Sequence, residues 1–286
     1  MSPCGAGDGV VWGMKTLAVL ATVPLSLSLM LTPGCPAADG LDDGAEGEGE
    51  GEAPADDFGF VFVTSDPLLG FSRAGAVFRR AQPRAFACTE TDVAGCVVLA
   101  CDDAPLAFVP TDAGDVDVSG ALVPVALRFN ADDGYNDVDA TALFNGGEDL
   151  VAVGVGATVP AFTLQTTAPT AVSLTSPAWP SPSSSLSVVR ADGLSLAWTG
   201  VSAGDVRATF NSADFAVEVS CAFPAAAGTG LVPAAALQAL DAGDGFLDVE
   251  VRTQTTQRQG SWQLQLSAST HAVAGTEPAI AAVVLQ

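Results

Sequence analysis

The chain has 286 residues, 49 % of them hydrophobic, and its 33 acidic residues outnumber its 10 basic ones to give a net charge of −23 at pH 7. Such a negative surface repels phosphate backbones, which excludes nucleic acid as a partner. The chain contains 30 Gly and 18 Pro, and its aliphatic residues are mostly Val, Ala and Leu. This composition favours short strands joined by turns and predicts an all-β protein.

The first predicted element is a signal peptide at residues 14–34. Lys15 supplies its positive charge, Leu17–Leu31 supply its apolar run, and Thr32–Gly34 supply a small-residue processing site. Pro24 interrupts the apolar run, which is also too short to cross a bilayer comfortably. We therefore expect an exported protein and not one with a membrane-spanning helix.

The end of this signal resembles that of bacterial lipoproteins, in which a lipid is attached to the cysteine that becomes the mature N-terminus. Gly34 precedes Cys35 as that pattern requires, whereas Thr32–Pro33 departs from it. The resemblance implies lipidation of Cys35 and an anchored protein of the cell envelope, at the outer membrane or the cell surface. Cleavage near Ala37–Ala38, which would give a secreted protein, is the alternative.

Residues 1–13 fit neither account, because they carry Asp8 and no positive charge. We interpret them as an extension of the gene start, with translation beginning at Met14. Residues 35–57 would then hold the lipidated cysteine and a disordered linker that keeps the folded part away from the membrane. That linker is rich in Asp, Glu and Gly and has no aromatic residue, so it cannot bury a core.

The segment 58–167 is predicted to form a first β-sandwich module. Its apolar runs are short and are separated by turn signals, as in sandwich folds. Its predicted strands are 58–63, 75–78, 95–100, 115–119, 123–129, 149–155 and 161–165.

The segment 168–286 is predicted to form a second module, because the strand pattern restarts near Thr167. A first strand led by Pro169 and a second strand ending in Trp198 resemble the opening of fibronectin type III and other immunoglobulin-like domains. Trp198 is interpreted as a core residue. The run at 232–240 predicts one short helix. The remaining strands are predicted at 205–210, 215–223, 246–253, 262–269 and 279–285.

Four cysteines of the exported part, Cys88, Cys96, Cys101 and Cys221, predict two disulfides. Cys96 and Cys101 are too far apart along one extended strand to pair, and we favour Cys88 with Cys96 and Cys101 with Cys221. A zinc site does not fit, because the chain has no C-x-x-C motif and His271 is its only histidine.

The sequence from Gly200 to Gly204 matches the G-x-S-x-G nucleophile elbow of α/β-hydrolases, which would make Ser202 a nucleophile. The elbow requires a helix after the serine, whereas the residues that follow Ser202 alternate like a strand. We therefore interpret the motif as a turn and expect no enzymatic activity, with a hydrolase using Ser202 as a remote alternative.

Clustered acids could instead bind calcium, since Ca²⁺ accepts carboxylate and carbonyl oxygens from one loop. Asp132, Asp133 and Asp137 lie in the densest such cluster, Asn130–Asp139, and Asp241–Asp248 is a weaker candidate. A solvated turn is the favoured interpretation and calcium the alternative. No other cofactor is expected.

The whole pattern, with a lipobox-like cysteine, an acidic linker and immunoglobulin-like β modules, resembles uncharacterised secreted bacterial lipoproteins. That resemblance implies an envelope location and an all-β fold but no activity. We expect a binding or structural role at the cell surface, such as binding a glycan or an envelope protein through strand-end loops. A purely structural protein is the alternative, and an exposed aromatic or acidic loop patch would favour the binding role.

Overall fold

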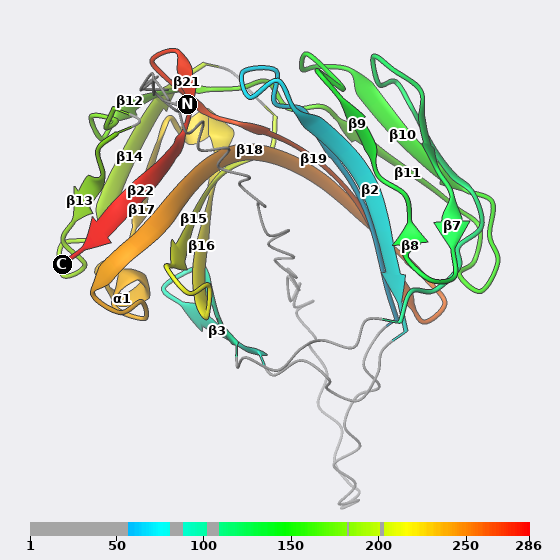
Figure 1. The fold of residues 1–286 in the computed structure, drawn as a ribbon, viewed down its shortest axis with the longest axis horizontal. Coiled ribbons are helices and arrows are strands. Elements are labelled where there is room, and N and C mark those ends of the chain that lie inside the picture. The colour runs from blue at the N-terminus through cyan, green and yellow to red at the C-terminus, as the bar shows by residue number, and fades with distance from the viewer. Residues whose placement is uncertain (1–56, 81–87, 102–108, 182, 201–202) are drawn as a thin grey trace, which may run out of the picture. The chain divides into compact units, whose positions relative to one another are not determined.

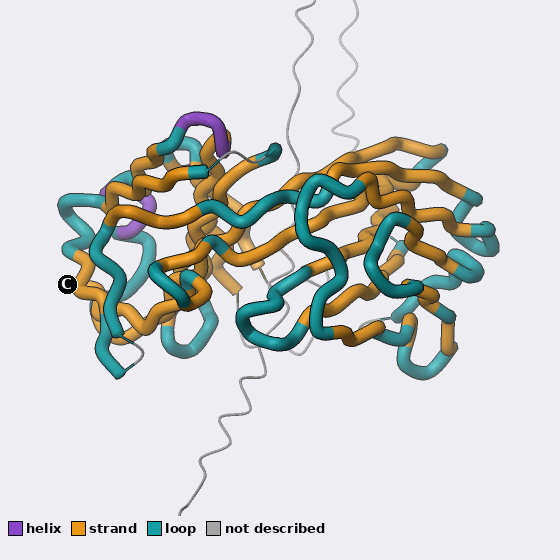
Figure 2. The backbone as a smooth tube through the Cα atoms, turned by 90° about the horizontal axis from the view of Figure 1, so that it is seen from above, coloured by secondary structure: helices purple, strands orange, loops and turns teal. Residues whose placement is uncertain are grey.

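The computed structural model describes residues 57–80, 88–101, 109–181, 183–200 and 203–286. Figure 2 shows that strands and loops make up nearly all of this backbone, with helix in short segments. The helices are α1 (Ala234–Leu237) and the 3-10 turn η1 (Ala225–Ala227). The all-β prediction is confirmed, and the helix expected at 232–240 forms as the shorter α1. Among the described residues, no helix is long and apolar enough to cross a membrane.

The largest sheet is a path of nine strands in the order β3-β4-β16-β15-β18-β19-β1-β2-β9 (Figure 1). A further strand, β22, pairs with β18 and with β13. Within the path, β1 runs parallel to β19, whereas β18 and β19 form a long antiparallel hairpin. The strands are β1 (Asp57–Thr64), β2 (Ser72–Arg79), β3 (Cys88–Val93), β4 (Cys96–Cys101), β9 (Val138–Ala140), β13 (Leu186–Val188), β15 (Asp205–Ser212), β16 (Val217–Pro224), β18 (Gly243–Gln259), β19 (Trp262–His271) and β22 (Ile280–Leu285).

Three smaller sheets accompany the large one. The second sheet has the order β11-β10-β5-β6, the third has the order β17-β14-β12-β20-β21, and β7 pairs with β8. Their strands are β5 (Val116–Ser119), β6 (Val125–Leu127), β7 (Phe129–Asn130), β8 (Gly134–Tyr135), β10 (Asp149–Gly154), β11 (Phe162–Thr167), β12 (Ser173–Ser176), β14 (Leu194–Thr199), β17 (Thr229–Val232), β20 (Val273–Ala274) and β21 (Glu277–Pro278).

The hydrophobic core consists of two clusters on one face of the large sheet. One cluster joins the second sheet to β1, β2 and β19, with Leu150, Leu164 and Leu266 among its most deeply buried members. The other joins the third sheet to β15, β16 and β18, with Phe210 and Leu247 among its members. The large sheet is therefore one layer of two β-sandwiches, because a sheet with one apolar face must bury that face against another layer.

Strands from both sides of the predicted module boundary at Thr167 are hydrogen-bonded in this one sheet. β1, from the predicted first module, pairs with β19 from the second along its whole length. β4 likewise pairs with β16. Each predicted module thus supplies strands to the sheet that both cores share. All of the described residues belong to one compact unit of the chain.

Trp198 lies in the second of these cores, as predicted. Its side chain is buried, and its indole Nε1 donates a hydrogen bond to the carbonyl oxygen of Ala225 at 2.8 Å. That bond satisfies the one polar atom of the ring and fixes η1 against β14.

The prediction of two disulfides is confirmed, but the favoured pairing is wrong. Cys88 is joined to Cys101 and Cys96 to Cys221. The reason is the hairpin of β3 and β4, whose two-residue turn Ala94–Gly95 has positive φ at both positions and sets Cys88 opposite Cys101. Cys96 then lies at the far end of β4, where it faces Cys221 of β16.

Candidate binding surface

The turn between β15 and β16 holds a large aromatic residue in an unfavourable backbone conformation. Phe215 has a φ of 58°, in the left-handed region, and its amide donates to the carbonyl oxygen of Ser212 at 2.9 Å. Hairpin turns of this kind usually place glycine there, because the left-handed conformation costs an ordinary L-residue about 1–2 kcal/mol. Phe215 therefore occupies this position at an energetic cost.

The side chain of Asp214 supports the turn. Its carboxylate accepts a hydrogen bond from the Ser212 hydroxyl at 2.6 Å and one from the Ala216 amide at 3.1 Å. These bonds, that from the Ser212 hydroxyl above all, hold the pKa of the Asp214 carboxyl below its usual range. The turn thus presents a charged carboxylate directly beside Phe215.

Phe215 stacks on Phe246, which lies near the start of β18. Their ring centroids are 5.6 Å apart and the ring planes differ by 8°. Both side chains are exposed, Phe215 by 46 % and Phe246 by 42 %. We call these two residues the aromatic patch. A stacked pair of exposed aromatic rings on a folded protein is a typical anchor for a ligand or a partner.

Polar and apolar side chains share the face of the sheet on which Phe246 lies. Asn211 of β15 and Ala282 of β22 are directly opposite Phe246 in the two strand registers. Side chains in such opposed positions lie on the same face of the sheet, within contact of each other. Asp244 and Ile280 lie on this face as well and are exposed. The aromatic patch is therefore bordered by an amide, a carboxylate and an aliphatic side chain.

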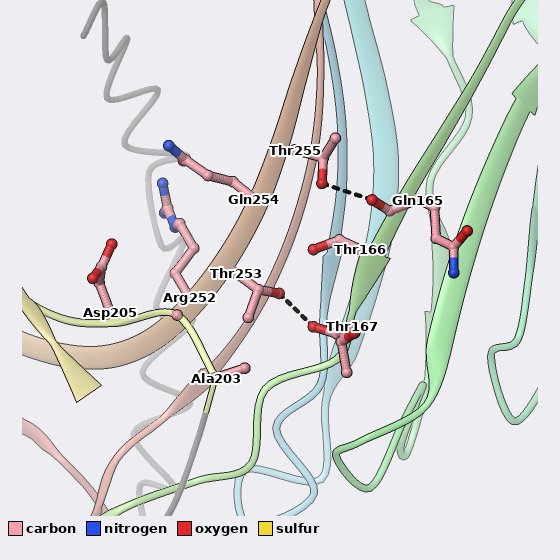
Figure 3. Close-up of a pocket in the computed structure, with 10 residues that line it drawn as sticks. Gln165, Thr166, Thr167, Ala203, Asp205, Arg252, Thr253, Gln254 and Thr255 are labelled. Atoms are coloured by element: carbon pink, nitrogen blue, oxygen red, sulfur yellow. Dashed lines mark hydrogen bonds between the residues drawn. The ribbon is translucent and has the colours of Figure 1, made fainter. Parts of the chain in front are cut away.

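A shallow, open pocket of about 550 Å³ lies where β11 meets β18 (Figure 3). Thr253 and Thr255 donate hydroxyl hydrogen bonds of 2.6 Å to the carbonyl oxygens of Thr167 and Gln165. These bonds connect an edge of the second sheet to β18. The pocket is lined mostly by hydroxyl and amide side chains, and Asp205 and Arg252 also line it. The hydroxyls of Thr253 and Thr255 are thus already engaged within the protein.

Charged side chains gather on the polar face of the large sheet. Glu250 lies opposite Arg207 of β15 and opposite His271 of β19, and its carboxylate is 2.6 Å from the guanidinium of Arg252. Although burial raises the pKa of Glu250, Arg252 and Arg207 outweigh it and hold that pKa below its usual value. Burial, together with Arg252, lowers the pKa of Arg207 to about 10. Glu250 is thus held in its charged form by the two arginines.

His271 completes this group and is held between two carboxylates. Its Nδ1 is in ion-pair contact with Asp66 at 2.7 Å, and its Nε2 lies 3.2 Å from Asp248. Since both ring nitrogens face carboxylate oxygens, this imidazole is poorly placed to accept a proton from a serine. Ser202, the candidate nucleophile, lies outside the described residues, as does the candidate lipidation site Cys35.

The structure places the predicted calcium residues in separate contacts. Asp137 pairs with Arg73 of β2, and Asp133 accepts a hydrogen bond from the Asn130 amide at 3.1 Å. Asp132 is engaged through its backbone amide, which donates to the Asn130 side-chain oxygen. Across the described ranges, no group of three or more His, Cys, Asp or Glu side chains could hold a metal ion. Calcium binding by this loop stays a prediction.

Sequence reasoning did not identify the aromatic patch. Phe215 and Phe246 both begin predicted strands, where a phenylalanine usually points into a core. The sequence around Phe215 does not predict a residue in the left-handed conformation, because glycine or asparagine is the usual residue at such a position. The exposure of Phe246 follows from β22 presenting only the small Ala282 beside it.

Comparison with known proteins gives little further information. No family model matches the chain, and no curated protein matches it. The solved structures that overlap with it include two that concern bacterial adhesins. One, described as concerning host cell surface retention of a 1.5-MDa bacterial ice-binding adhesin, is 13 % identical, with 81 % of this chain and 66 % of that chain covered, at a TM-score of 0.18.

The other solved structure is described as a Ca²⁺-stabilised adhesin that helps an Antarctic bacterium to reach out and bind ice. It is 16 % identical, with 70 % of this chain and 52 % of that chain covered, at a TM-score of 0.17. This chain therefore spans less than two thirds of the length of either structure. Such low TM-scores do not indicate a shared fold.

Proposed function

We propose that the chain is an exported binding protein of the bacterial cell envelope, and that it binds a glycan through the aromatic patch of Phe215 and Phe246. The observation that carries this proposal is the strained, exposed Phe215. A left-handed phenylalanine costs stability, and its ring lies at the surface where it contributes little to the core.

Sugar chemistry fits the patch and its borders. The C–H bonds on one side of a sugar ring carry partial positive charge and pack on the negative face of an aromatic ring. The amide of Asn211 can donate to and accept from sugar hydroxyls, and the carboxylates of Asp214 and Asp244 can accept from them. A binding site of this kind combines an apolar platform with a few polar groups that fix the orientation of the ligand.

Export and lipidation belong to the same proposal. The signal-like run before Cys35 supports both, and the two disulfides support an oxidising compartment outside the cytoplasm. A lipid on Cys35 would keep the binding surface at the envelope, next to its polysaccharides. We also propose that the protein is not an enzyme; a serine nucleophile such as Ser202 would need a histidine base, and the only histidine of the chain is already held by Asp66 and Asp248.

The test is the retention of the full chain, in detergent micelles, on polysaccharides purified from bacterial envelopes. Phe246→Ala should weaken binding by tenfold or more, because a central aromatic anchor contributes about 2 kcal/mol or more to binding. Phe71→Ala is the matched control, since Phe71 is 50 % exposed and lies outside the patch. Absence of wild-type binding, or an equal loss in both variants, would contradict a glycan site here. Binding of a purified envelope protein instead, lost in Phe246→Ala, would assign the patch to a protein partner.

A further inference from the structure

We propose that His271 is a pH-sensitive link that fastens the loop between β1 and β2 to the large sheet. This loop runs from Ser65 to Phe71. The proposal is independent of the glycan site, because the loop and the aromatic patch share no residue.

The geometry of the link involves three elements. Asp66 Oδ1 accepts a hydrogen bond from the backbone amide of His271 at 2.9 Å and lies 2.7 Å from its ring Nδ1. On the other side of the ring, Nε2 lies 3.2 Å from Asp248 Oδ1. A neutral imidazole carries a lone pair on one of its nitrogens, which here would face a carboxylate oxygen. The arrangement therefore favours the doubly protonated, positively charged ring.

The charges around the ring divide into two sets. On β18, Glu250 faces the ring from the opposed position, but its charge is shared with Arg252 and with Arg207 of β15. Asp66 and Asp248 are the carboxylates in direct contact with the imidazole. The uncharged Thr64 of β1 and Ile280 of β22 also lie on this face, opposite Ser269 and Asp248 in the strand registers.

These contacts raise the pKa of His271 well above its usual value. Burial alone would lower that pKa, but Asp248 and Asp66 together outweigh the burial. When folding raises the pKa of a group, protonation of that group stabilises the folded state. For a histidine this stabilisation is complete at a pH below the unfolded pKa of about 6.5. That stabilisation is lost as the pH rises through the folded pKa. The link is therefore closed in neutral and mildly acidic solution and opens in alkaline solution.

The loop depends on this link because its tip makes little use of the core. Leu68, Leu69 and Phe71 are all exposed. Within the loop, the Leu69 and Phe71 amides donate to the Asp66 carbonyl at 3.1 and 3.4 Å, and the Gly70 amide donates to the Pro67 carbonyl at 3.2 Å. The Asp66 amide donates to the Ser72 hydroxyl at 2.9 Å, so three of these four bonds involve Asp66. When the His271 ring loses its proton, Asp66 loses its ion pair with that ring. The loop then keeps its backbone bonds to β19, from the His271 amide to Asp66 and from the Ser65 amide to the Ser269 carbonyl.

Because the chain has a single histidine, NMR can follow the link without ambiguity. The full chain, without a histidine tag, is titrated from pH 5 to 10, and the ring carbon signals of His271 are recorded together with the amide-exchange protection factors of Leu68–Phe71. We expect a titration midpoint well above about 6.5, with protection in the loop falling over the same pH range. A midpoint at or below that value, or loop protection that does not change with pH, would overturn the proposal.

Variants separate the link from general stability. Asp66→Asn removes one of the two carboxylates in contact with the ring and should lower the His271 titration midpoint by about one pH unit or more. One pH unit is a tenfold change in the protonation equilibrium. It should also leave the loop weakly protected at every pH. Asp117→Asn removes a carboxylate of the second sheet and should leave the His271 midpoint unchanged. His271→Gln should abolish the pH dependence of loop protection. If Asp66→Asn does not fold, comparison of His271→Gln with the wild-type titration tests the link by itself.

Discussion

Cys96 lies directly opposite Cys221 in the register of β4 and β16, and the disulfide between them closes a sequence separation of 125 residues. The other disulfide, Cys88–Cys101, closes a separation of only 13 residues. A cross-link that closes a longer loop removes more entropy from the unfolded chain, by about 5 kcal/mol for the first bond and about 3 kcal/mol for the second.

We therefore expect the Cys96→Ala, Cys221→Ala variant to lose more unfolding free energy than the Cys88→Ala, Cys101→Ala variant. Denaturant titration of both pairs measures the difference. Equal losses would show that strain or residual structure, and not loop length, sets the contribution. In the unfolded, unreduced protein an alkylating reagent should modify none of the four cysteines, and modification of two or more would contradict the disulfides themselves.

Trp198→Phe should lower the free energy of unfolding by about 1–3 kcal/mol. The substitution removes the donor to the Ala225 carbonyl, so that a buried acceptor loses its partner. Thermal or denaturant unfolding measures the loss, and Trp179→Phe, at a partly buried position against the same core, is the comparison. A loss at Trp198 no larger than that at Trp179 would mean that water replaces the missing bond.

If calcium binds to the Asn130–Asp139 loop, the protein should have a higher melting temperature in millimolar Ca²⁺ than in chelator. At a hundredfold excess over Kd, binding would stabilise the fold by about 2.7 kcal/mol. Asp137 would have to leave Arg73, so Arg73→Ala should strengthen the effect. An unchanged midpoint would rule out the site, and a shift that persists in Asp132→Asn with Asp137→Asn would place the ion elsewhere.

Lipidation predicts that growing cells incorporate a labelled fatty acid into the wild-type protein and not into Cys35→Ala. Absence of label from both proteins would favour ordinary secretion. A chain that begins at Met14 should be exported at least as well as the full chain, and lost export would show that residues 1–13 contribute.

Strands with alternating apolar residues were predictable to within a few residues, because burial of one face imposes that alternation. β10, predicted at 149–155, runs from Asp149 to Gly154. β1, predicted at 58–63 from a continuous apolar run, runs from Asp57 to Thr64. β18 was predicted only at 246–253, yet it continues to Gln259 through a polar run that pairs with β19. β3 escaped prediction because its interior side chains are exposed and give no apolar pattern.

The candidate site was less predictable than the fold. The interpretation of Trp198 as a core residue is confirmed, because a lone tryptophan within an apolar strand pattern usually faces inward. His271 contacts Asp248, which is nearby in the sequence, and Asp66, which is 205 positions away. Only the parallel pairing of β1 with β19 brings Asp66 to His271. No local sequence pattern indicates such long-range pairing. The predicted disulfide pairing was wrong for a related reason, because the two-residue turn between β3 and β4 was not recognised in the sequence.

The most direct measurement compares Phe215→Gly with Phe215→Ala in both stability and glycan binding. Glycine relieves the left-handed strain that alanine keeps, so the Gly variant should be more stable than the Ala variant by about 1 kcal/mol. Both variants lose the exposed ring, and we expect each to bind envelope polysaccharide at least tenfold more weakly than wild type. A Phe215→Gly chain that folds stably but no longer binds would show that stability is given up for binding at this residue. Full binding by Phe215→Gly would contradict the account.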